Sequence, residues 1–268
     1  MIKNLSIFIC TINNEIENLF IKSYSGYNLT ILNQRPKFLS KKSTLATKKN
    51  IRWYDIDNKG LSANRNFAIS LIDTNNEFVY LTDDDIIIDK NFNEKFSEVV
   101  KKNKDIDIFA FNVKKSNGEL KENLNIIKNI GFLSSMKLSS VQLVFRSKVF
   151  IDGKIRYDER FGTGAKYKMG EENILLFDLL RKKYKIKYFP IQIGTLMDNE
   201  SSWFNGFNDK YFFDRGAVFR RMFGHLAIPY SIAFCARKYK IFKYENTFFN
   251  SILYCVKGIR DFDKNDKK

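Results

Sequence analysis

Residues 78–88 of this chain are Phe-Val-Tyr-Leu-Thr-Asp-Asp-Asp-Ile-Ile-Ile. The apolar run before the acids is rich in β-favouring residues and predicts a short buried strand. Three consecutive carboxylates, Asp83, Asp84 and Asp85, repel one another and raise each other's pKa values, so something must offset that cost. A divalent cation with hard oxygen ligands would do so, and open α/β sheets bind ligands where their strands end. We therefore expect a ligand or metal site directly after this strand.

The alternative explanation of the acidic triplet is a solvated turn between a strand and a helix. Asp89 and Asn91 downstream favour such a turn. Against it, Ile86, Ile87 and Ile88 place apolar side chains where a solvated turn would be polar. Because clustered acids in clefts are more often functional than not, the site is the preferred interpretation.

Strand and helix patterns alternate through the first two hundred residues. Apolar, β-favouring runs predict strands at 5–10, 29–32, 78–81, 106–113, 141–145 and 186–193. Apolar residues at helical spacing predict helices at 62–72, 92–100 and 171–182, the first opened by a Ser N-cap after Gly60. This βαβ rhythm predicts an α/β fold with a mostly parallel sheet covered by helices.

Composition is typical of a soluble enzyme with an anionic partner. At 268 residues and 44% hydrophobic, the chain can build a large core, as one α/β domain or as one domain with an appendage. The net charge of +16 implies nucleotide phosphates, nucleic acid or an anionic membrane surface as the partner. The many Lys, Asn and Ile residues also fit an AT-rich genome, so charge alone does not choose among these partners.

The cysteines and the N-terminus indicate a cytoplasmic protein. Cys10, Cys235 and Cys255 are odd in number and widely spaced, which favours reduced, buried thiols over a disulfide framework or a zinc site. The first residues lack the apolar segment of a signal peptide, and no apolar run approaches the roughly 18 residues of a membrane span.

The last third of the chain changes character after about residue 205. Helices dense in aromatic and basic residues are expected at 206–223, 228–237 and 244–259. Residues 201–268 contain 13 Lys or Arg and 6 Asp or Glu, a net charge of +7. Such helices can lie on an anionic membrane surface, or they can pack on the rest of the protein with solvated lysines. The two interpretations are compatible, and packing is slightly favoured.

A second candidate site lies in the segment 55–66, which contains two acids, a Gly and a predicted helix start. A Gly turn before a helix supplies free N–H groups and the positive end of the helix dipole, both suited to an anion. Arg65 and Asn66 lie in the first turns of that helix and could reach a phosphate or the acidic triplet. Taken alone, this pattern favours an ordinary capped helix.

A third candidate site pairs Gly162 and Gly164 with Glu171 and Glu172 at the start of the next helix. The glycines suggest a loop beside a pocket, and a carboxylate at such a helix start can act as a general base toward a sugar hydroxyl. The helix dipole alone also explains acids at this position. The basic stretch 35–52, with seven Lys or Arg and no acid, is a fourth candidate, and a solvated loop is its favoured explanation.

The motifs together resemble the family 2 glycosyltransferases, over residues 4 to about 225. The resemblance is carried, in order, by Gly60-Leu-Ser-Ala-Asn-Arg-Asn, Tyr80-Leu-Thr-Asp-Asp-Asp, Phe161-Gly-Thr-Gly and Gly170-Glu-Glu. It implies a GT-A fold at 1–205, with nucleotide-sugar binding in about 1–115 and acceptor binding in about 116–205. Residues 206–268 would form a basic, aromatic helical appendage.

The family also implies an activity. This activity is the inverting transfer of a hexosyl or N-acetylhexosaminyl group from a nucleoside diphosphate sugar to a hydroxyl of a glycan or lipid-linked glycan. The donor expected first is a UDP-sugar. Mn²⁺ or Mg²⁺ usually assists by stabilising the leaving diphosphate while a carboxylate deprotonates the acceptor. For a chain of this composition, we expect bacterial capsule or lipopolysaccharide synthesis in the cytoplasm, peripherally on an anionic inner membrane face.

Roles follow from the matching positions. Asp85 would be the metal ligand together with Asp83, and Glu172 the catalytic base, with Glu171 as the second candidate. Arg65 would contact the diphosphate or the acidic triplet, and Asp55 and Asp57 the base or ribose. The full set expected at the nucleotide sugar is Thr11, Asn13, Asp55, Asp57, Gly60, Asn64, Arg65, Asp83 and Asp84.

The chain departs from the family pattern at two places. The second strand ends in Asn33-Gln34 instead of the Asp pair that often holds the nucleobase. The segment 196–202 lacks the His that related sequences often carry. Either Asp198 replaces it, or the metal rests on the acidic triplet and water. His225, the single histidine, is expected to be packed or on the surface.

Two alternatives remain open. One is a member of the same fold that binds a nucleotide sugar without catalysis. The other is a nucleic-acid-binding protein, which we rank well below the enzyme because the acidic clusters would repel phosphates without a metal. No nucleic-acid partner is therefore expected.

Overall fold

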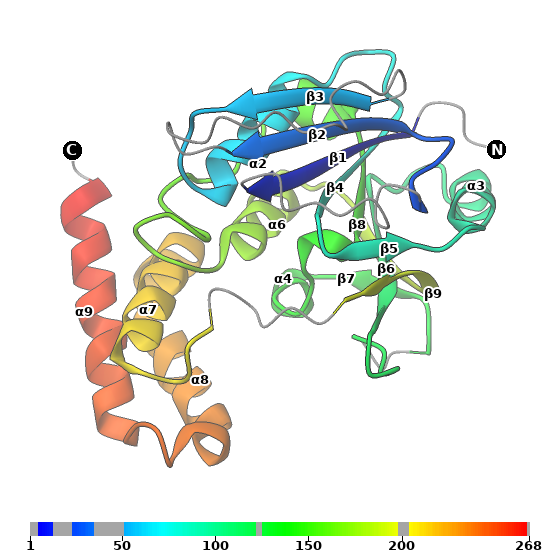
Figure 1. Ribbon diagram of the computed structural model, residues 1–268. Helices are drawn as coiled ribbons and strands as arrows, with labels where there is room; N and C mark the ends of the chain where they lie inside the picture. Colours follow the sequence, from blue (N-terminus) through cyan, green and yellow to red (C-terminus); the bar gives the residue numbers. More distant parts are fainter. Residues whose placement is uncertain (1–4, 13–22, 35–50, 122–124, 198–203, 267–268) are drawn as a thin grey trace.

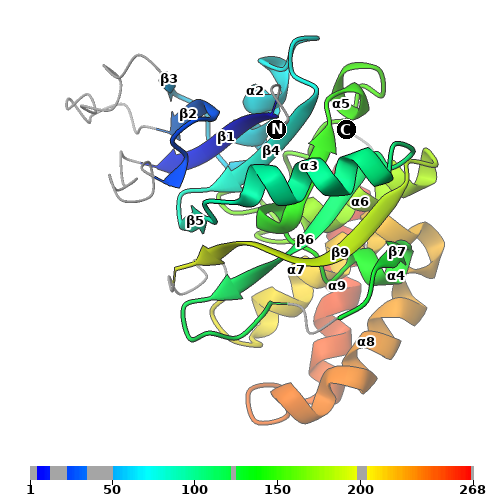
Figure 2. The same ribbon diagram turned by 90° about the vertical axis from the view of Figure 1, so that its right-hand side faces the viewer.

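The computed structural model describes residues 5–12, 23–34, 51–121, 125–197 and 204–266. Their centre is a single mixed β-sheet (Figures 1 and 2). The strands follow one another across the sheet in the order β3 (Ile51–Ile56), β2 (Asn28–Gln34), β1 (Leu5–Ile12), β4 (Phe78–Asp83), β8 (Leu143–Arg146), β6 (Ile108–Lys115), β9 (Ile186–Leu196) and β5 (Ile86–Ile88), and β7 (Lys128–Ile130) pairs with β9.

The sheet has two parts of different topology. Strands β3, β2, β1 and β4 are mutually parallel. Strand β8 is antiparallel to both of its neighbours, β4 and β6, while β6 and β9 are parallel and β5 is antiparallel to β9. The parallel strands β1 and β4 are buried along almost their whole length, which is why they consist of nearly continuous apolar runs.

Register brings several predicted site residues to one edge of the sheet. Cys10 of β1 lies beside Asp83 of β4, and Thr11 lies beside Asn33 of β2. Asn33 in turn lies beside Asp55 of β3. The carboxyl ends of the four parallel strands therefore meet at the same edge, which is where ligands bind in open α/β sheets.

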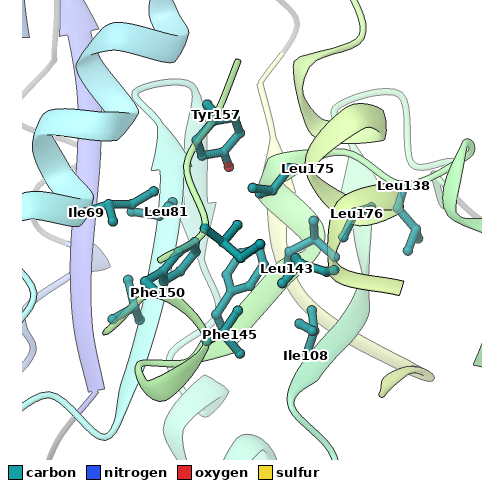
Figure 3. Close-up of a cluster of buried hydrophobic side chains, with 14 of the residues drawn as sticks. Ile69, Leu81, Ile108, Leu138, Leu143, Phe145, Phe150, Tyr157, Leu175 and Leu176 are labelled. Atoms are coloured by element: carbon teal, nitrogen blue, oxygen red, sulfur yellow. The ribbon is translucent and has the colours of Figure 1, made fainter. Parts of the chain in front are cut away.

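Helices cover both faces of the sheet. On one face, α3 (Phe92–Lys102) contributes Phe92 and Phe96 to a core that includes Phe109 and Phe111 of β6. On the other face, α2 (Leu61–Ser70) and α6 (Glu171–Arg181) pack on the sheet through a second core, which Figure 3 shows with Ile69, Leu143 and Leu175. The short helices α4 (Phe132–Ser135) and α5 (Lys148–Ile151) lie near the middle of the chain.

Three further helices extend beyond the sheet (Figure 1). They are α7 (Asp209–Phe223), α8 (Ala227–Phe242) and α9 (Phe248–Asp266). Helices α7 and α9 pack closely because glycines lie at their contact, with Gly216 against Cys255 and Gly258 against Phe213. Within the described part of the chain, no helix is long and apolar enough to cross a membrane.

The expected α/β fold with C-terminal helices is thus confirmed, and three local predictions need correction. Strands β3, β5 and β7 are not predicted from the sequence, and β8 interrupts the parallel order. The N-cap of α2 is Gly60, with a positive φ of 97°, and not Ser62. Ser62 is the second residue of the helix, and its hydroxyl donates to the carbonyl of Phe161 at 2.6 Å.

The cysteine and histidine predictions are confirmed. Cys10, Cys235 and Cys255 are free, buried thiols. Burial raises the pKa of the Cys10 thiol to about 12, so it stays protonated at neutral pH. His225 lies on the surface, in the short turn between α7 and α8.

Candidate active site

A buried arginine stands at the centre of the candidate site. Arg65 of α2 is 0% exposed, and its guanidinium reaches carboxylates from two other parts of the chain. Nη2 donates to Oδ1 of Asp83 at 2.9 Å, at the end of β4. Nη1 donates to Oε1 of Glu172 at 3.0 Å and lies 3.5 Å from Oε1 of Glu171, both at the start of α6. One cation therefore joins the second and third candidate sites to the acidic triplet.

Two more side chains complete the surroundings of Arg65. Ser140 accepts a hydrogen bond from Nη2 of Arg65 at 2.9 Å and donates to Oδ2 of Asp83 at 3.3 Å. The ring of Tyr157 lies under the guanidinium, 5.4 Å from its carbon to the ring centroid. Burial alone would lower the pKa of Arg65, but the carboxylates of Asp83 and Glu172 outweigh it and raise the pKa. The guanidinium is therefore a permanent buried charge.

The two glutamates at the start of α6 differ in protonation. Burial, and then the charge of Glu172, raise the pKa of Glu171 to about 8, so Glu171 carries a proton at neutral pH. Burial acts in the same direction on Glu172, but the Arg65 guanidinium and backbone hydrogen bonds outweigh it and lower the pKa of Glu172. Glu172 is also the more accessible of the two side chains, at 18% against 8%. Glu172 is thus the ionised, reachable carboxylate.

The other two acids of the triplet have different environments. Asp84 accepts a hydrogen bond from the Thr11 hydroxyl, which links the ends of β1 and β4. Asp85 has a buried Oδ1 with no hydrogen-bond partner among the described residues. Burial, together with the charges of Asp83 and Asp84, raises the pKa of Asp85 to about 7. A buried carboxylate oxygen without a hydrogen-bond partner is unfavourable, and a bound cation would relieve that cost.

A divalent cation fits this donor set in part. Carboxylate oxygen is the donor that Mg²⁺ and Mn²⁺ prefer, and Mg²⁺ commonly takes one or two carboxylates while substrate phosphates and water supply the rest. Asp85 offers such an oxygen, whereas Asp83 is already held by Arg65 and Ser140. No group of three or more His, Cys, Asp or Glu side chains gathers to hold a metal within the described ranges.

Glycines allow the loop 161–165 to lie against the start of α2. The backbone N–H of Leu61 donates to the Thr163 carbonyl at 2.9 Å. Gly164, with a positive φ of 82°, approaches so closely that a Cβ there would lie 3.0 Å from Cα of Gly60. A Cβ on Gly162 would meet the Glu171 carboxyl carbon at 3.0 Å. The paired glycines therefore serve close packing beside the glutamates, which agrees with a loop bordering the site.

The residues expected at the nucleotide come from several elements, with Thr11 at the end of β1, Asp55 at the end of β3 and Asn64 in α2. The amide of Asn33 donates to Oδ1 of Asp55 at 2.7 Å, and the Trp53 indole donates to the same oxygen at 3.0 Å. Asn64 is buried and donates to the Leu32 carbonyl, so its amide serves the fold. Asp57 is exposed in the loop that leads to α2.

The structure shows what the residues do at the two places where the chain departs from the family pattern, Asn33-Gln34 and the segment after β9. Gln34 donates to the carbonyls of Asn58 and Gly60, so this residue fixes the loop before α2. The segment after β9 reaches the acidic triplet, since the N–H of Met197 donates to the Asp85 carbonyl at 2.8 Å. Asn13 and Asp198 lie outside the described residues, and so does most of the basic stretch 35–52.

Three residues of the site were not singled out from the sequence. Ser140 and Tyr157 contact Arg65. The charge of Lys121 partly offsets the rise in the pKa of Asp85 and contributes to the lowered pKa of Glu172. Lys121 also donates to the Ser139 hydroxyl at 2.5 Å. These three residues come from segments outside the motifs that carry the family resemblance, so only the tertiary structure shows that they lie at the site. Asn66, by contrast, was considered for a phosphate but binds the backbone of Tyr157 through both ends of its amide.

Comparison with known proteins identifies the fold. No protein-family model and no curated protein sequence matches the chain. Solved structures do: residues 1–349 of S. aureus TarS in complex with UDP-GlcNAc superpose with a TM-score of 0.65 at 14% identity, over 96% of this chain and 80% of that one. The same part of TarS in complex with UDP gives 0.60 at 14% identity, over 88% and 72%. At such identity the likeness shows the fold alone, and the fold is GT-A.

Proposed function

We propose that this chain is an inverting glycosyltransferase of the family 2 kind, which transfers a sugar from a UDP-sugar to a hydroxyl group. The observation that carries the proposal is the buried Arg65, which holds the ionised Glu172 and Asp83 of the triplet at one edge of a GT-A sheet. The TarS complexes with UDP and UDP-GlcNAc support a uridine nucleotide as the donor.

The donor would lie at the carboxyl ends of the parallel strands. We assign Asp55 and Asp57 to the base or ribose, because Asp55 lies at the end of β3, Asp57 directly follows that strand, and both are exposed. Asp83 and Asp84 would face the ribose and the sugar from the end of β4. The remaining expected contacts are Thr11, Asn13 and Gly60. Arg65 would act through Asp83, and Asn64 by holding α2 against β2, because both side chains are buried.

Asp85 is the residue best placed to hold Mn²⁺ or Mg²⁺, with Asp83 as the second expected ligand. When bound, the ion would neutralise charge on the departing diphosphate. Lys121 supplies a positive charge on the same side, since its charge lowers the pKa of Asp85.

Glu172 would act as the base. Its carboxylate accepts the proton of the acceptor hydroxyl as that oxygen bonds to the anomeric carbon and the bond to the diphosphate breaks, so the configuration inverts. Arg65 keeps Glu172 ionised and fixes its position. Glu171, the second candidate for the base, is protonated at neutral pH and could accept a proton only after losing its own.

The acceptor would be a glycan or lipid-linked glycan, bound by about residues 116–205 of a catalytic domain that spans 1–205. Residues 206–268 would form the helical appendage. The transferred group would be hexosyl or N-acetylhexosaminyl, in capsule or lipopolysaccharide synthesis. A lipid-linked acceptor requires the protein to work at the inner face of the cytoplasmic membrane.

A thermal-shift screen tests the donor. A ligand that binds only the folded state raises its melting temperature, so UDP, GDP, UDP-glucose and UDP-GlcNAc should be compared with and without Mn²⁺. We expect UDP and one UDP-sugar to stabilise the chain, more strongly with the metal. If no nucleotide sugar shifts the melting temperature, the proposal is wrong.

Release of UDP from the stabilising donor then tests catalysis. Turnover should be present in the natural chain and strongly reduced in Glu172→Gln. Stabilisation by the donor without any turnover, across a panel of glycan acceptors, would instead identify a non-catalytic nucleotide-sugar-binding protein.

A further inference from the structure

The hairpin formed by α8 and α9 exposes large apolar side chains at its turn. The turn, residues 243–247, lies at the end of the helices that points away from the sheet (Figures 1 and 2). Tyr244 is 87% exposed and Phe249 is 83% exposed, and Ile241 and Leu253 are at least half exposed. We call these four residues the hairpin tip.

The tip is held in shape by hydrogen bonds. Asp209 of α7 accepts hydrogen bonds from the amides of Asn246 and Asn250, at 3.0 and 2.7 Å. Phe248, next to Phe249, packs into the core among α7, α8 and α9. The exposed rings therefore lie on a fixed support, and their exposure is a property of the fold.

Most of the charged side chains around the tip are basic. Lys240, Lys243, Lys257 and Arg260 are exposed, and the sequence contains no Asp or Glu from 215 to 244. The two acids nearest the tip are engaged within the fold. Asp209 binds the two asparagine amides, and Glu245 accepts the backbone N–H of Phe207 at 2.6 Å.

Apolar and basic side chains also lie together along one face of helix α9. Phe249, Leu253, Lys257 and Arg260 follow one another at intervals of three or four residues, so they share one face of the helix. The stripe is apolar at the tip and basic farther along. Such an order suits the boundary of a lipid bilayer, where apolar groups enter the acyl region and cations remain at the phosphates.

We propose that the hairpin tip inserts into the surface of an anionic lipid bilayer, with the four basic residues against the lipid phosphates. An anionic bilayer is favoured over a second copy of this chain, because a symmetric contact through the tip would bring the same cations together. The proposal goes beyond glycosyl transfer: it assigns the membrane contact to a surface remote from Arg65 and independent of the donor.

Co-sedimentation of the full chain with vesicles tests this assignment. Two vesicle types are compared, phosphatidylcholine alone and phosphatidylcholine with about 30% phosphatidylglycerol, which gives the surface a negative potential. We expect binding to the anionic vesicles only, and a loss of roughly tenfold or more in the double variant Tyr244→Ser/Phe249→Ser. The matched control is Ile126→Ser/Ile127→Ser, which removes exposed apolar groups outside the hairpin and should leave binding unchanged.

Vesicle binding, dimer formation and turnover are measured for the natural chain and the double variant. Equal binding by the natural chain and the Tyr244/Phe249 double variant would overturn the proposal, as would absence of binding to anionic vesicles. Concentration-dependent dimers that dissociate in the double variant, without vesicle binding, would also overturn it and identify the tip as a self-association surface. Turnover with a water-soluble acceptor should be unchanged in the double variant, so failure here and failure of the proposed catalysis are separable.

Discussion

Arg65 shows how one side chain can organise a site at the scale of single residues. A buried guanidinium without partners would be very unfavourable, so the carboxylates around it are required by the fold as well as by any chemistry. The same contact decides protonation: Glu172, closest to the cation, is ionised, while Glu171 is not. Pairs of acids whose environments separate their pKa values are typical of catalytic sites.

Glu172→Gln should lower kcat by about a thousandfold, within the range found for loss of a general base. The amide has nearly the same shape but cannot accept the proton. Glu171→Gln should lower kcat much less, since Glu171 is already protonated at neutral pH. Both variants are compared by initial rates of UDP release, with thermal melts to show that they are folded. A larger loss in Glu171→Gln would exchange the two roles.

Arg65→Met should destabilise the protein by about 3–5 kcal/mol, because it leaves buried carboxylates without their cation. Arg65→Lys should recover part of the stability, but little activity, since a single ammonium cannot bridge Asp83 and Glu172 as the planar guanidinium does. Urea unfolding and kcat measure the two effects. Arg156→Met, which removes an arginine that donates only to carbonyls, is the control and should retain activity.

Asp85 predicts how stability depends on pH. In metal-free buffer, the folded chain keeps the Asp85 proton up to about pH 7, whereas the unfolded chain loses it near pH 4. The folded state therefore binds more protons in this window, so the free energy of unfolding falls as pH rises from about 4 to about 7. Glu171 extends the decline to about pH 8.

Asp85→Asn should make that decline shallower and stabilise the metal-free protein at pH 8 by on the order of 1 kcal/mol. Mn²⁺ at pH 8 should raise the melting temperature of the natural chain and leave Asp85→Asn unchanged. Melts across pH in chelator and in Mn²⁺ give both results. An equal response to Mn²⁺ in the two proteins would remove Asp85 as the metal ligand.

At the scale of elements, glycines set the distance between α7 and α9. A Cβ on Gly216 would lie 2.0 Å from the carbonyl oxygen of Cys255, and a Cβ on Gly258 would lie 1.9 Å from that of Phe213. Helix backbones in such contact cannot accommodate a methyl group without separating. The side chains around the contact include Phe212, Phe262 and Val218, so any separation would disturb a whole core.

Gly216→Ala and Gly258→Ala should therefore each destabilise the protein by about 1–3 kcal/mol, the usual cost of overpacking, despite the better helix propensity of Ala. Gly131→Ala is the matched control, because nothing lies within 4 Å of the added Cβ. Urea denaturation measures all three. A stabilising effect at Gly216 would mean that α7 and α9 are not in backbone contact.

For the whole molecule, the sequence predicted the α/β class and most elements, because the buried strands are continuous apolar runs. It could not predict that β8 would enter antiparallel between β4 and β6, since pairing depends on tertiary contacts. The acids of the site stood out as motifs. For Arg65, their common partner, the sequence left two alternatives, the diphosphate or the acidic triplet, because a buried arginine cannot be distinguished from a phosphate-binding one before the fold is known. Ser140, Tyr157 and Lys121 carry no motif.

The Arg65 network also bears on whether the protein can be divided into modules. Its partners lie on both sides of the expected boundary near residue 115, with Asp83 before it and Ser140, Glu171 and Glu172 after it. A fragment that ends at 115 would keep the cation, lose most of its partners and expose β4 where β8 should pair. We expect no cooperative melting of such a fragment by circular dichroism. A cooperative transition would contradict this expectation. If there is none, donor and acceptor halves can be exchanged between such proteins only when Arg65 and Asp83 are replaced together with the partners of Arg65 after residue 115.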